Sequence, residues 1–171
     1  SIAMVFINYQ DFSISTDSLT GLNNRRSLDL RMQMLANEHR TYPICLMLMD
    51  INYFKQINDT YGHYEGDNAL RETAEILRRV VQGQELFLAR YGGDEFAMMG
   101  KLADVNAAEQ LKSDVYGAFR LRNEDRKTPY DITMSVGYEI VMHNQEYNIA
   151  ELIREADKML YIEKSINKRR M

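Results

Sequence analysis

The sequence predicts an α/β (α+β) fold in which one central, mostly antiparallel sheet is flanked by helices. Residues 44–49 form a short, continuous apolar run, which is typical of a strand buried on both faces. Two glycines, at 92 and 93, separate two further apolar runs and predict a β-hairpin. Helical segments alternate with these strands in the order α, β, α, α, β-hairpin, α, β, α. We therefore expect a βααββαβ core of the ferredoxin-like or polymerase-palm kind.

The first elements lead up to the buried strand. Residues 17–22 have turn chemistry and precede a predicted helix over about 25–38, where apolar residues recur at helical spacing. Pro43 opens the apolar strand 44–49, and Asp50 lies at its carboxyl end.

Two helical segments follow the strand. A short helix is predicted over 53–58, and residues 59–63 are expected to form a loop. After Gly66 a longer helix runs to about residue 81, and Gly83 supplies its stop.

The second half of the chain completes the sheet. Its predicted elements are hairpin strands at 86–89 and 96–99, a helix capped by Asp104 and ending near 122, a strand at 132–141, and a helix at 149–164. We expect the tight hairpin turn to need glycine because φ can be positive there.

Composition limits the classes of function. The chain has 171 residues, a length typical of one domain. Its formal net charge of −4 does not favour nucleic-acid binding. A basic cluster at 164–170 is read as a solvated helix end rather than a DNA patch. The single cysteine, Cys45, lies in the buried run and excludes a disulfide scaffold. No apolar run is long enough to span a membrane. Residues 1–16 are interpreted as a linker from a missing upstream region, which leaves 17–171 as the catalytic domain.

The double-glycine turn also carries two acids, Asp94 and Glu95. Carboxylates held at a rigid turn suit a hard cation such as Mg²⁺, which takes oxygen ligands and usually binds together with substrate phosphates. The simpler alternative is an acidic, solvated turn.

Asp50 and the residues after it form a second candidate site. A carboxylate at the end of a buried strand is costly unless it is paired or bound to a metal. The following helix offers free backbone N–H groups for phosphate oxygens, and Lys55 adds an ammonium group one turn later. Together they indicate a nucleoside-triphosphate and magnesium site, although each residue alone could be a strand-end cap or a surface lysine.

Four motifs in this chain resemble those of the GGDEF domain, in the same order and at similar spacing. They cover residues from about 17 to 168 and read Asp17-x-Leu19-Thr20-Gly21-Leu22-x-Asn24-Arg25-Arg26, Asp50-Ile51-x-x-Phe54-Lys55-x-Ile57-Asn58-Asp59-x-x-Gly62-His63-x-x-Gly66-Asp67, Ala89-Arg90-Tyr91-Gly92-Gly93-Asp94-Glu95-Phe96 and Ala156-Asp157-x-x-Leu160-Tyr161-x-x-Lys164.

The resemblance implies a diguanylate cyclase, which condenses two GTP molecules into cyclic di-GMP and releases pyrophosphate. It implies that the Asp50 carboxylate, the Ile51 carbonyl and Asp94 hold Mg²⁺, with Mn²⁺ as an alternative. It assigns Asp94 the role of general base as well, with Glu95 supporting the metal site. Backbone amides of Tyr53, Phe54 and Lys55 are expected to cradle the β- and γ-phosphates. The Lys55 side chain, Lys164 and Lys168 would offset their charge.

Guanine recognition is assigned by the same resemblance to Asn58 and Asp67, with His63 lining the site. An acid such as Asp67 can accept from the N1–H and N2–H₂ groups of guanine, which adenine does not offer together. For His63, a structural role that ties the loop to the sheet is an equal alternative.

The sequence also departs from the family pattern. Asn52 replaces the second acid of the strand-end motif, and Asn167-Lys168 stands where Gly-Arg is common. The product-inhibition motif, Arg-x-x-Asp, is lost because Gly83 and Leu86 occupy its charged positions. We therefore expect no inhibitory binding of cyclic di-GMP at that site.

The resemblance also implies partners. One site holds one GTP, so catalysis needs a homodimer with two-fold facing domains, controlled by an upstream sensor or membrane region. It places the domain in the cytoplasm and leaves open membrane anchoring of the full-length protein. The alternative function is a degenerate GGDEF module that binds GTP and regulates a partner without catalysis.

Overall fold

The computed structural model describes residues 14–169. Residues 1–13 of the expected linker lie outside the described part, as do residues 170–171. The strands form one antiparallel sheet in the order β2-β3-β1-β4. They are β1 (Ile44–Ile51), β2 (Leu86–Arg90), β3 (Glu95–Lys101) and β4 (Met134–Val141). The helices around them are α2 (Arg25–Asn37), α3 (Phe54–Tyr61), α4 (His63–Val81), α5 (Val105–Glu124) and α6 (Ile149–Arg169).

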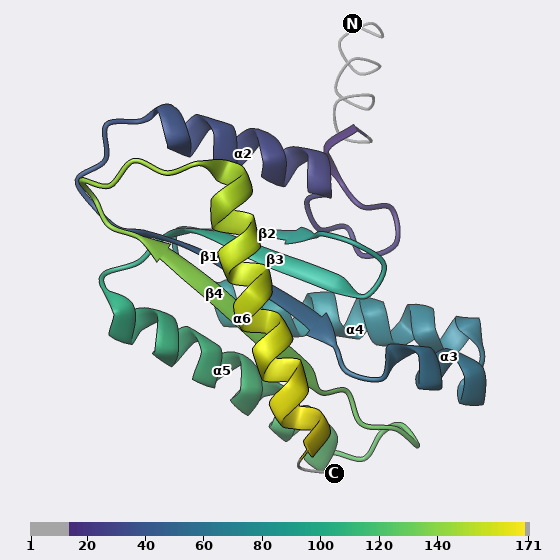
Figure 1. Ribbon diagram of the computed structural model, residues 1–171. Coiled ribbons are helices and arrows are strands. Elements are labelled where there is room, and N and C mark those ends of the chain that lie inside the picture. Colours follow the sequence, from purple (N-terminus) through teal and green to yellow (C-terminus); the bar gives the residue numbers. More distant parts are fainter. Residues whose placement is uncertain (1–13, 170–171) are drawn as a thin grey trace, which may run out of the picture.

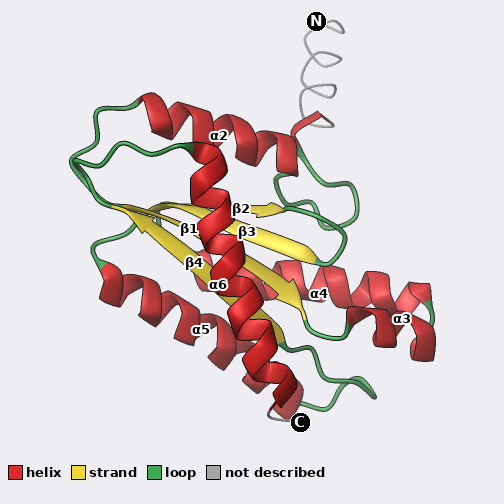
Figure 2. Cartoon of the chain, in the orientation of Figure 1, coloured by secondary structure: helices red, strands yellow, loops and turns green. Residues whose placement is uncertain are grey.

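Helices cover both faces of the sheet. In Figure 1, α6 crosses one face diagonally with α2 beside it, while α4 and α5 lie against the opposite face; Figure 2 shows the sheet between these two layers. The order β1-α3-α4-β2-β3-α5-β4 confirms the predicted βααββαβ core and the antiparallel hairpin.

Strand β1 is buried along its whole length, as the apolar run predicts. Its side chains alternate between two hydrophobic clusters, because successive residues of a strand point to opposite faces. Cys45, Met47, Met49 and Ile51 pack in the cluster of α4 and α5, and Ile44, Leu46 and Leu48 pack in the cluster of α2 and α6.

Helix α6 lies directly on the backbone of β4. A Cβ atom on Gly137 would stand 2.1 Å from the backbone nitrogen of Leu160. Only glycine permits this approach, which brings the second half of α6 close to the carboxyl end of β1. Within residues 14–169, no helix is both long and apolar enough for a transmembrane span.

The region between β1 and β2 differs from the prediction. Residues 59–61 continue α3 rather than form a loop, and α4 begins at His63 rather than after Gly66. Gly62, at φ 91°, is the break between the two helices. Gly66 lies buried inside α4, where an added Cβ would stand 1.8 Å from Oδ1 of Asn58. Gly66 therefore serves close helix packing, which periodicity does not distinguish from a helix start.

The hairpin forms as predicted, but the reason given for its glycines is wrong. Among the described glycines only Gly21, Gly62 and Gly83 have positive φ, so Gly92 and Gly93 do not use the left-handed region. An added Cβ on Gly92 would instead lie 2.4 Å from a carboxylate oxygen of Glu95. This glycine makes room for the acid that follows the turn.

Candidate active site

Asp50 is the one polar side chain on the α6-facing side of β1. It shares the strand period of Leu46 and Leu48 and is only 5% exposed. Lys164 of α6 forms an ion pair with it. Burial raises the pKa of the Asp50 carboxyl, and the nearby Lys164 lowers it while Asp94 and Glu95 raise it; the net direction is upward.

The two acids of the hairpin turn lie beside Asp50. Glu95 is the register partner of Asp50 across the β1–β3 ladder, and directly opposed residues share a face of the sheet. The carbonyl of Asp94 accepts a hydrogen bond from the Ile51 amide at 3.1 Å. The hairpin therefore brings its acids to the end of β1, although they are separated from it by more than 40 positions in the sequence.

Arg90 holds the turn that carries Asp94. Its guanidinium donates to the carbonyls of Gly92 (3.1 Å) and Gly93 (2.7 and 3.1 Å), and also to both carboxylate oxygens of Asp17 (3.1 and 3.3 Å). The backbone N–H and the hydroxyl of Thr20 also donate to the Asp17 carboxylate. One half-buried arginine thus connects the 17–22 turn to the double-glycine turn.

A cavity of about 250 Å³ opens at this end of the sheet. Its walls come from β1, the turn after it, the hairpin and α6. The lining residues are Asp50, Ile51, Asn52, Tyr53, Phe54, Lys55, Asp94, Lys164, Asn167 and Lys168. Most of the residues predicted to act on metal and phosphate therefore surround one space, and Glu95 lies next to it.

The donor set fits an oxygen-seeking divalent cation. Within residues 14–169, no group of three or more His, Cys, Asp or Glu side chains forms a ready-made cage. Magnesium does not require one, because it is usually held by one or two carboxylates plus substrate phosphates and water. The buried Asp50 carboxylate, with Asp94 in the same cavity, supplies such a pair, and a cation would offset the cost of its burial.

The turn from β1 into α3 is strained at Tyr53. This residue has φ 55° and ψ 30°, the left-handed region that non-glycine residues rarely adopt, and it occupies the N-cap of α3. Such outliers are often found at functional sites. The side chain of Lys55 extends into solvent, 90% exposed, and pairs with Asp59 at 3.0 Å. It is therefore free to turn toward a ligand.

The predicted guanine-binding residues do not line this cavity. Asn58 is half-buried on α3 against Gly66, Asp67 is half-buried on the first turns of α4, and His63 is exposed at the start of that helix. They belong to the α3–α4 pair, which extends away from the sheet beyond the end of β1 (Figure 1). Of the residues of α3, Phe54 and Lys55 line the cavity. A ligand reaching both groups would extend from the cavity along α3.

A family model described as "Diguanylate cyclase, GGDEF domain" matches residues 14–170, nearly the whole chain. The chain belongs to the GGDEF family. Its match includes all four motifs from which the resemblance was read.

Curated GGDEF relatives are similar over most of this chain. It is 31% identical over 157 residues to the diguanylate cyclase VdcA of Vibrio cholerae serotype O1, covering 91% of this chain and 45% of VdcA. It is 33% identical over 166 residues to the diguanylate cyclase DosC of Escherichia coli K12, covering 92% and 35% respectively. The chain therefore spans less than half the length of these relatives.

A solved GGDEF structure shares the fold. The coiled coil and GGDEF domain of DgcB from Caulobacter crescentus, in complex with c-di-GMP, superposes with a TM-score of 0.85 at 28% identity. The match covers 95% of this chain and 87% of that chain. The four-stranded antiparallel sheet flanked by helices is thus a GGDEF fold.

Sequence reasoning missed part of the surroundings of this GGDEF site. Asn52 and Asn167 were noted only as departures from the family, yet both line the cavity and hydrogen-bond through Ser135. Arg90 was seen as a motif residue without a role. The only signal in the sequence was that polar residues stand at the ends of apolar segments, which does not reveal contacts across more than 70 positions.

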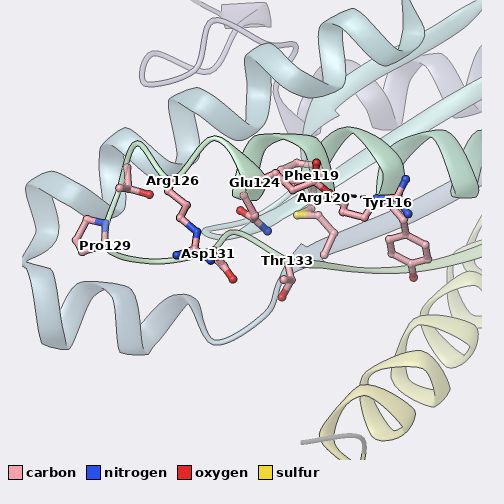
Figure 3. Close-up of a pocket in the computed structure, with 11 residues that line it drawn as sticks. Tyr116, Phe119, Arg120, Glu124, Arg126, Pro129, Asp131 and Thr133 are labelled. Atoms are coloured by element: carbon pink, nitrogen blue, oxygen red, sulfur yellow. Dashed lines mark ion pairs between the residues drawn. The ribbon is translucent and has the colours of Figure 1, made fainter.

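A larger cavity of about 690 Å³ lies beside α5 and the segment after it. Figure 3 shows its lining, with Tyr116 at the end nearest α6 and Pro129 at the far end. None of the predicted site residues lines it. A smaller depression that includes Asn52, Tyr53 and Thr133 lies between it and the candidate site.

Proposed function

We propose that this chain is the catalytic domain of a diguanylate cyclase, which joins two GTP molecules into cyclic di-GMP and releases two pyrophosphates. The observation that supports this most is the cavity in which the carboxylates of Asp50 and Asp94 meet the ammonium groups of Lys164 and Lys168. Opposite charges at one site suit a substrate that carries both a divalent cation and phosphates.

The reaction consists of two equivalent phosphoryl transfers. The 3′-oxygen of one GTP attacks the α-phosphorus of the other, and a new P–O bond forms. The bond between the α-phosphorus and the bridging oxygen to the β-phosphorus breaks, and pyrophosphate leaves. The hydroxyl proton must pass to a base. Asp94, which lines the cavity and is held by the Arg90-bound turn, is the proposed acceptor.

Asp50, Asp94 and the Ile51 carbonyl would hold Mg²⁺ or Mn²⁺, with Glu95 behind them. A bound divalent cation supplies Lewis-acid stabilisation of the phosphate and lowers the pKa of a coordinated hydroxyl. Asp50 is suited to the task because it is fixed by a buried strand and already pairs with a cation, Lys164. The position of its carboxylate would change little when a metal ion binds.

Phosphate binding is assigned to the start of α3 and to α6. The first backbone amides of a helix have no partner within the helix and favour anions. Tyr53, Phe54 and Lys55 line the cavity at that end, which supports their role with the β- and γ-phosphates. Lys164 and Lys168 of α6 line the same cavity.

Guanine is proposed to bind along α3 and α4, outside the phosphate cavity. Asp67 would accept from the N1–H and N2–H₂ groups of the base, and Asn58 would donate to its O6. Asn58 is already oriented by its contact with Gly66. His63, exposed at the start of α4, is close enough in the chain to line the base.

Because one cavity accommodates one triphosphate, the reaction requires two copies of the domain facing each other. We propose that an upstream region, such as a sensor or a membrane segment, controls this homodimer. The domain would work in the cytoplasm, where GTP is supplied. The second candidate function, a degenerate module that binds GTP without turnover, is favoured only by Asn52 at a family acid position.

The test is incubation of concentrated protein with GTP and Mg²⁺, followed by chromatographic identification of the nucleotides. We expect cyclic di-GMP and pyrophosphate, at a rate per domain that rises with protein concentration. Asp94→Asn should abolish the product, whereas Asp114→Asn, on the exposed side of α5, should not. GTP binding without product would favour the regulatory module. Product formation by Asp94→Asn at the wild-type rate would refute the assigned chemistry.

A further inference from the structure

Within residues 14–169, the end of α6 that carries both lysines has no buried apolar residue. The buried residues of this helix are Leu152, Ala156 and Leu160, all before the final two turns. Ile162 and Ile166 beyond them are exposed. The lysines of the proposed phosphate site therefore stand on a helical segment that the hydrophobic core does not hold.

Polar contacts hold this segment instead. Glu163 accepts from the Tyr116 hydroxyl at 2.7 Å and pairs with Lys112 at 3.4 Å. Lys164 pairs with Asp50. One turn after Glu163, on the same face of the helix, Nδ2 of Asn167 donates to Oγ of Ser135 at 2.9 Å. Asn167 lies between the two lysines in the sequence, and it lines the same cavity.

The contact of Asn167 continues to the turn after β1. The Ser135 hydroxyl donates to Oδ1 of Asn52 at 2.6 Å, and Nδ2 of Asn52 donates to the Thr133 hydroxyl at 3.1 Å. The backbone N–H of Asn52 also donates to the backbone carbonyl of Thr133 at 2.8 Å. The bonds from Asn167 to Ser135 and from Ser135 to Asn52 run in one direction, from α6 through β4 to the turn that opens α3, and Asn52 is held there by Thr133, just before β4.

Ser135 is the middle residue of this row of hydrogen bonds and is fully buried, at 0% exposure. Its single hydroxyl proton is donated to Asn52, and one of its two lone pairs accepts from Asn167, so the hydroxyl serves as donor and as acceptor at once. Ser135 does not line the cavity. Any effect of its hydroxyl on ligand binding must therefore pass through its two neighbours.

We propose that Asn52, Ser135 and Asn167 are positioning residues that fix the end of α6 to the β1–α3 turn. Together with the Asp50–Lys164 ion pair, these hydrogen bonds hold Lys164 and Lys168 at the cavity that the start of α3 also lines. This inference rests on the proposed function in that GTP is the ligand. It also explains Asn52: an amide offers the donor and the acceptor that this position uses, and adds no charge beside Asp50 and Asp94.

The first measurement is the affinity for α,β-methylene-GTP with Mg²⁺, by isothermal titration calorimetry. Ser135→Ala and Asn167→Ala should each weaken binding about 3- to 10-fold, the equivalent of one lost hydrogen bond. The double variant should bind no more weakly than either single variant, because both break the same chain. Ser165→Ala is the matched control, since among the described residues its hydroxyl bonds only within α6, to the Tyr161 carbonyl.

The second measurement separates positioning from general stability. Hydrogen exchange in the nucleotide-free protein should speed up at residues 161–169 in Ser135→Ala, with the core strands unchanged. Where turnover is measurable, the loss in kcat/KM should come mainly from a higher KM. Wild-type affinity in Ser135→Ala, additive losses in the double variant, or unchanged exchange at the end of α6 would each overturn the proposal.

These readouts do not depend on turnover. A protein that binds the analogue but makes no cyclic di-GMP would refute the cyclase function. The affinities of the single and double variants would still decide whether Asn52, Ser135 and Asn167 position the end of α6.

Discussion

Replacement of Arg90 by alanine should destabilise the domain and disable the site together. The guanidinium serves three acceptors: the Asp17 carboxylate and the carbonyls of Gly92 and Gly93. The arginine side chain is 16% exposed and that of Asp17 is 20% exposed, so solvent only partly replaces the lost bonds. At about 1 kcal/mol for each acceptor, after a discount for partial exposure, the free energy of unfolding should fall by about 3 kcal/mol.

The assay is urea unfolding followed by circular dichroism, together with steady-state turnover. Because the released turn carries Asp94, kcat/KM should fall by about 10- to 100-fold, as expected when a catalytic group is displaced by up to an ångström. Arg90→Lys should lie between wild type and alanine, since an ammonium group lacks the planar fork of the guanidinium. The control is Arg79→Ala on α4. In the part of the chain that the structure describes, the guanidinium of Arg79 bonds only to the Glu75 carbonyl of its own helix.

A stability loss below about 1 kcal/mol for Arg90→Ala would refute this reasoning, because it would mean that the bonds to the turn are replaced by water at no cost. Wild-type turnover would refute the link between the turn and catalysis.

Three further outcomes are expected. Burial alone would raise the pKa of Asp17, but the hydrogen bonds from Thr20 together with the charge and hydrogen bonds of Arg90 outweigh it and lower the pKa below the usual 3.8. The stability supplied by the charged form is therefore present above about pH 4 and lost as pH falls through the lower folded pKa; the urea midpoints of wild type and Asp17→Asn should differ at pH 7 and converge as the pH falls below that folded pKa. Gly137→Ala should cost about 2–4 kcal/mol in urea unfolding, because its Cβ would overlap the backbone of Leu160 2.1 Å away, and an unchanged midpoint would contradict the close packing of α6. Calorimetric titration with cyclic di-GMP should show no tight binding that depends on the segment around Gly83, where the family's inhibitory arginine is absent; tight stoichiometric binding there would contradict this.

The fold was predictable because each element of this chain has a local signal. The run over 44–49 indicated a strand buried on both faces, and β1 is buried at every position. Asp104 was predicted to cap a helix, and its side chain accepts from the Ala107 amide at 2.9 Å. Cys45 was expected to be buried, and burial raises the pKa of its thiol to about 12. Such features depend on neighbouring residues alone.

The candidate site was predictable only in part. Asp50 and Asp94 could be placed in one cavity because their motifs resemble a known family. The hydrogen bonds through Ser135 could not be predicted, because a buried serine in an apolar strand gives the same sequence pattern whether or not its hydroxyl has partners. The break between α3 and α4 was misplaced because a glycine can end a helix or permit close packing, and periodicity does not separate the two roles of Gly62 and Gly66.

The central claim is that Asp50 and Asp94 hold one divalent cation beside the triphosphate of GTP. Its most direct test is the affinity for α,β-methylene-GTP with and without Mg²⁺, measured for the wild type, Asp50→Asn and Asp94→Asn. The wild type should gain about tenfold or more in affinity from Mg²⁺, and both variants should lose that gain. A magnesium-dependent gain of wild-type size in both variants would contradict the account.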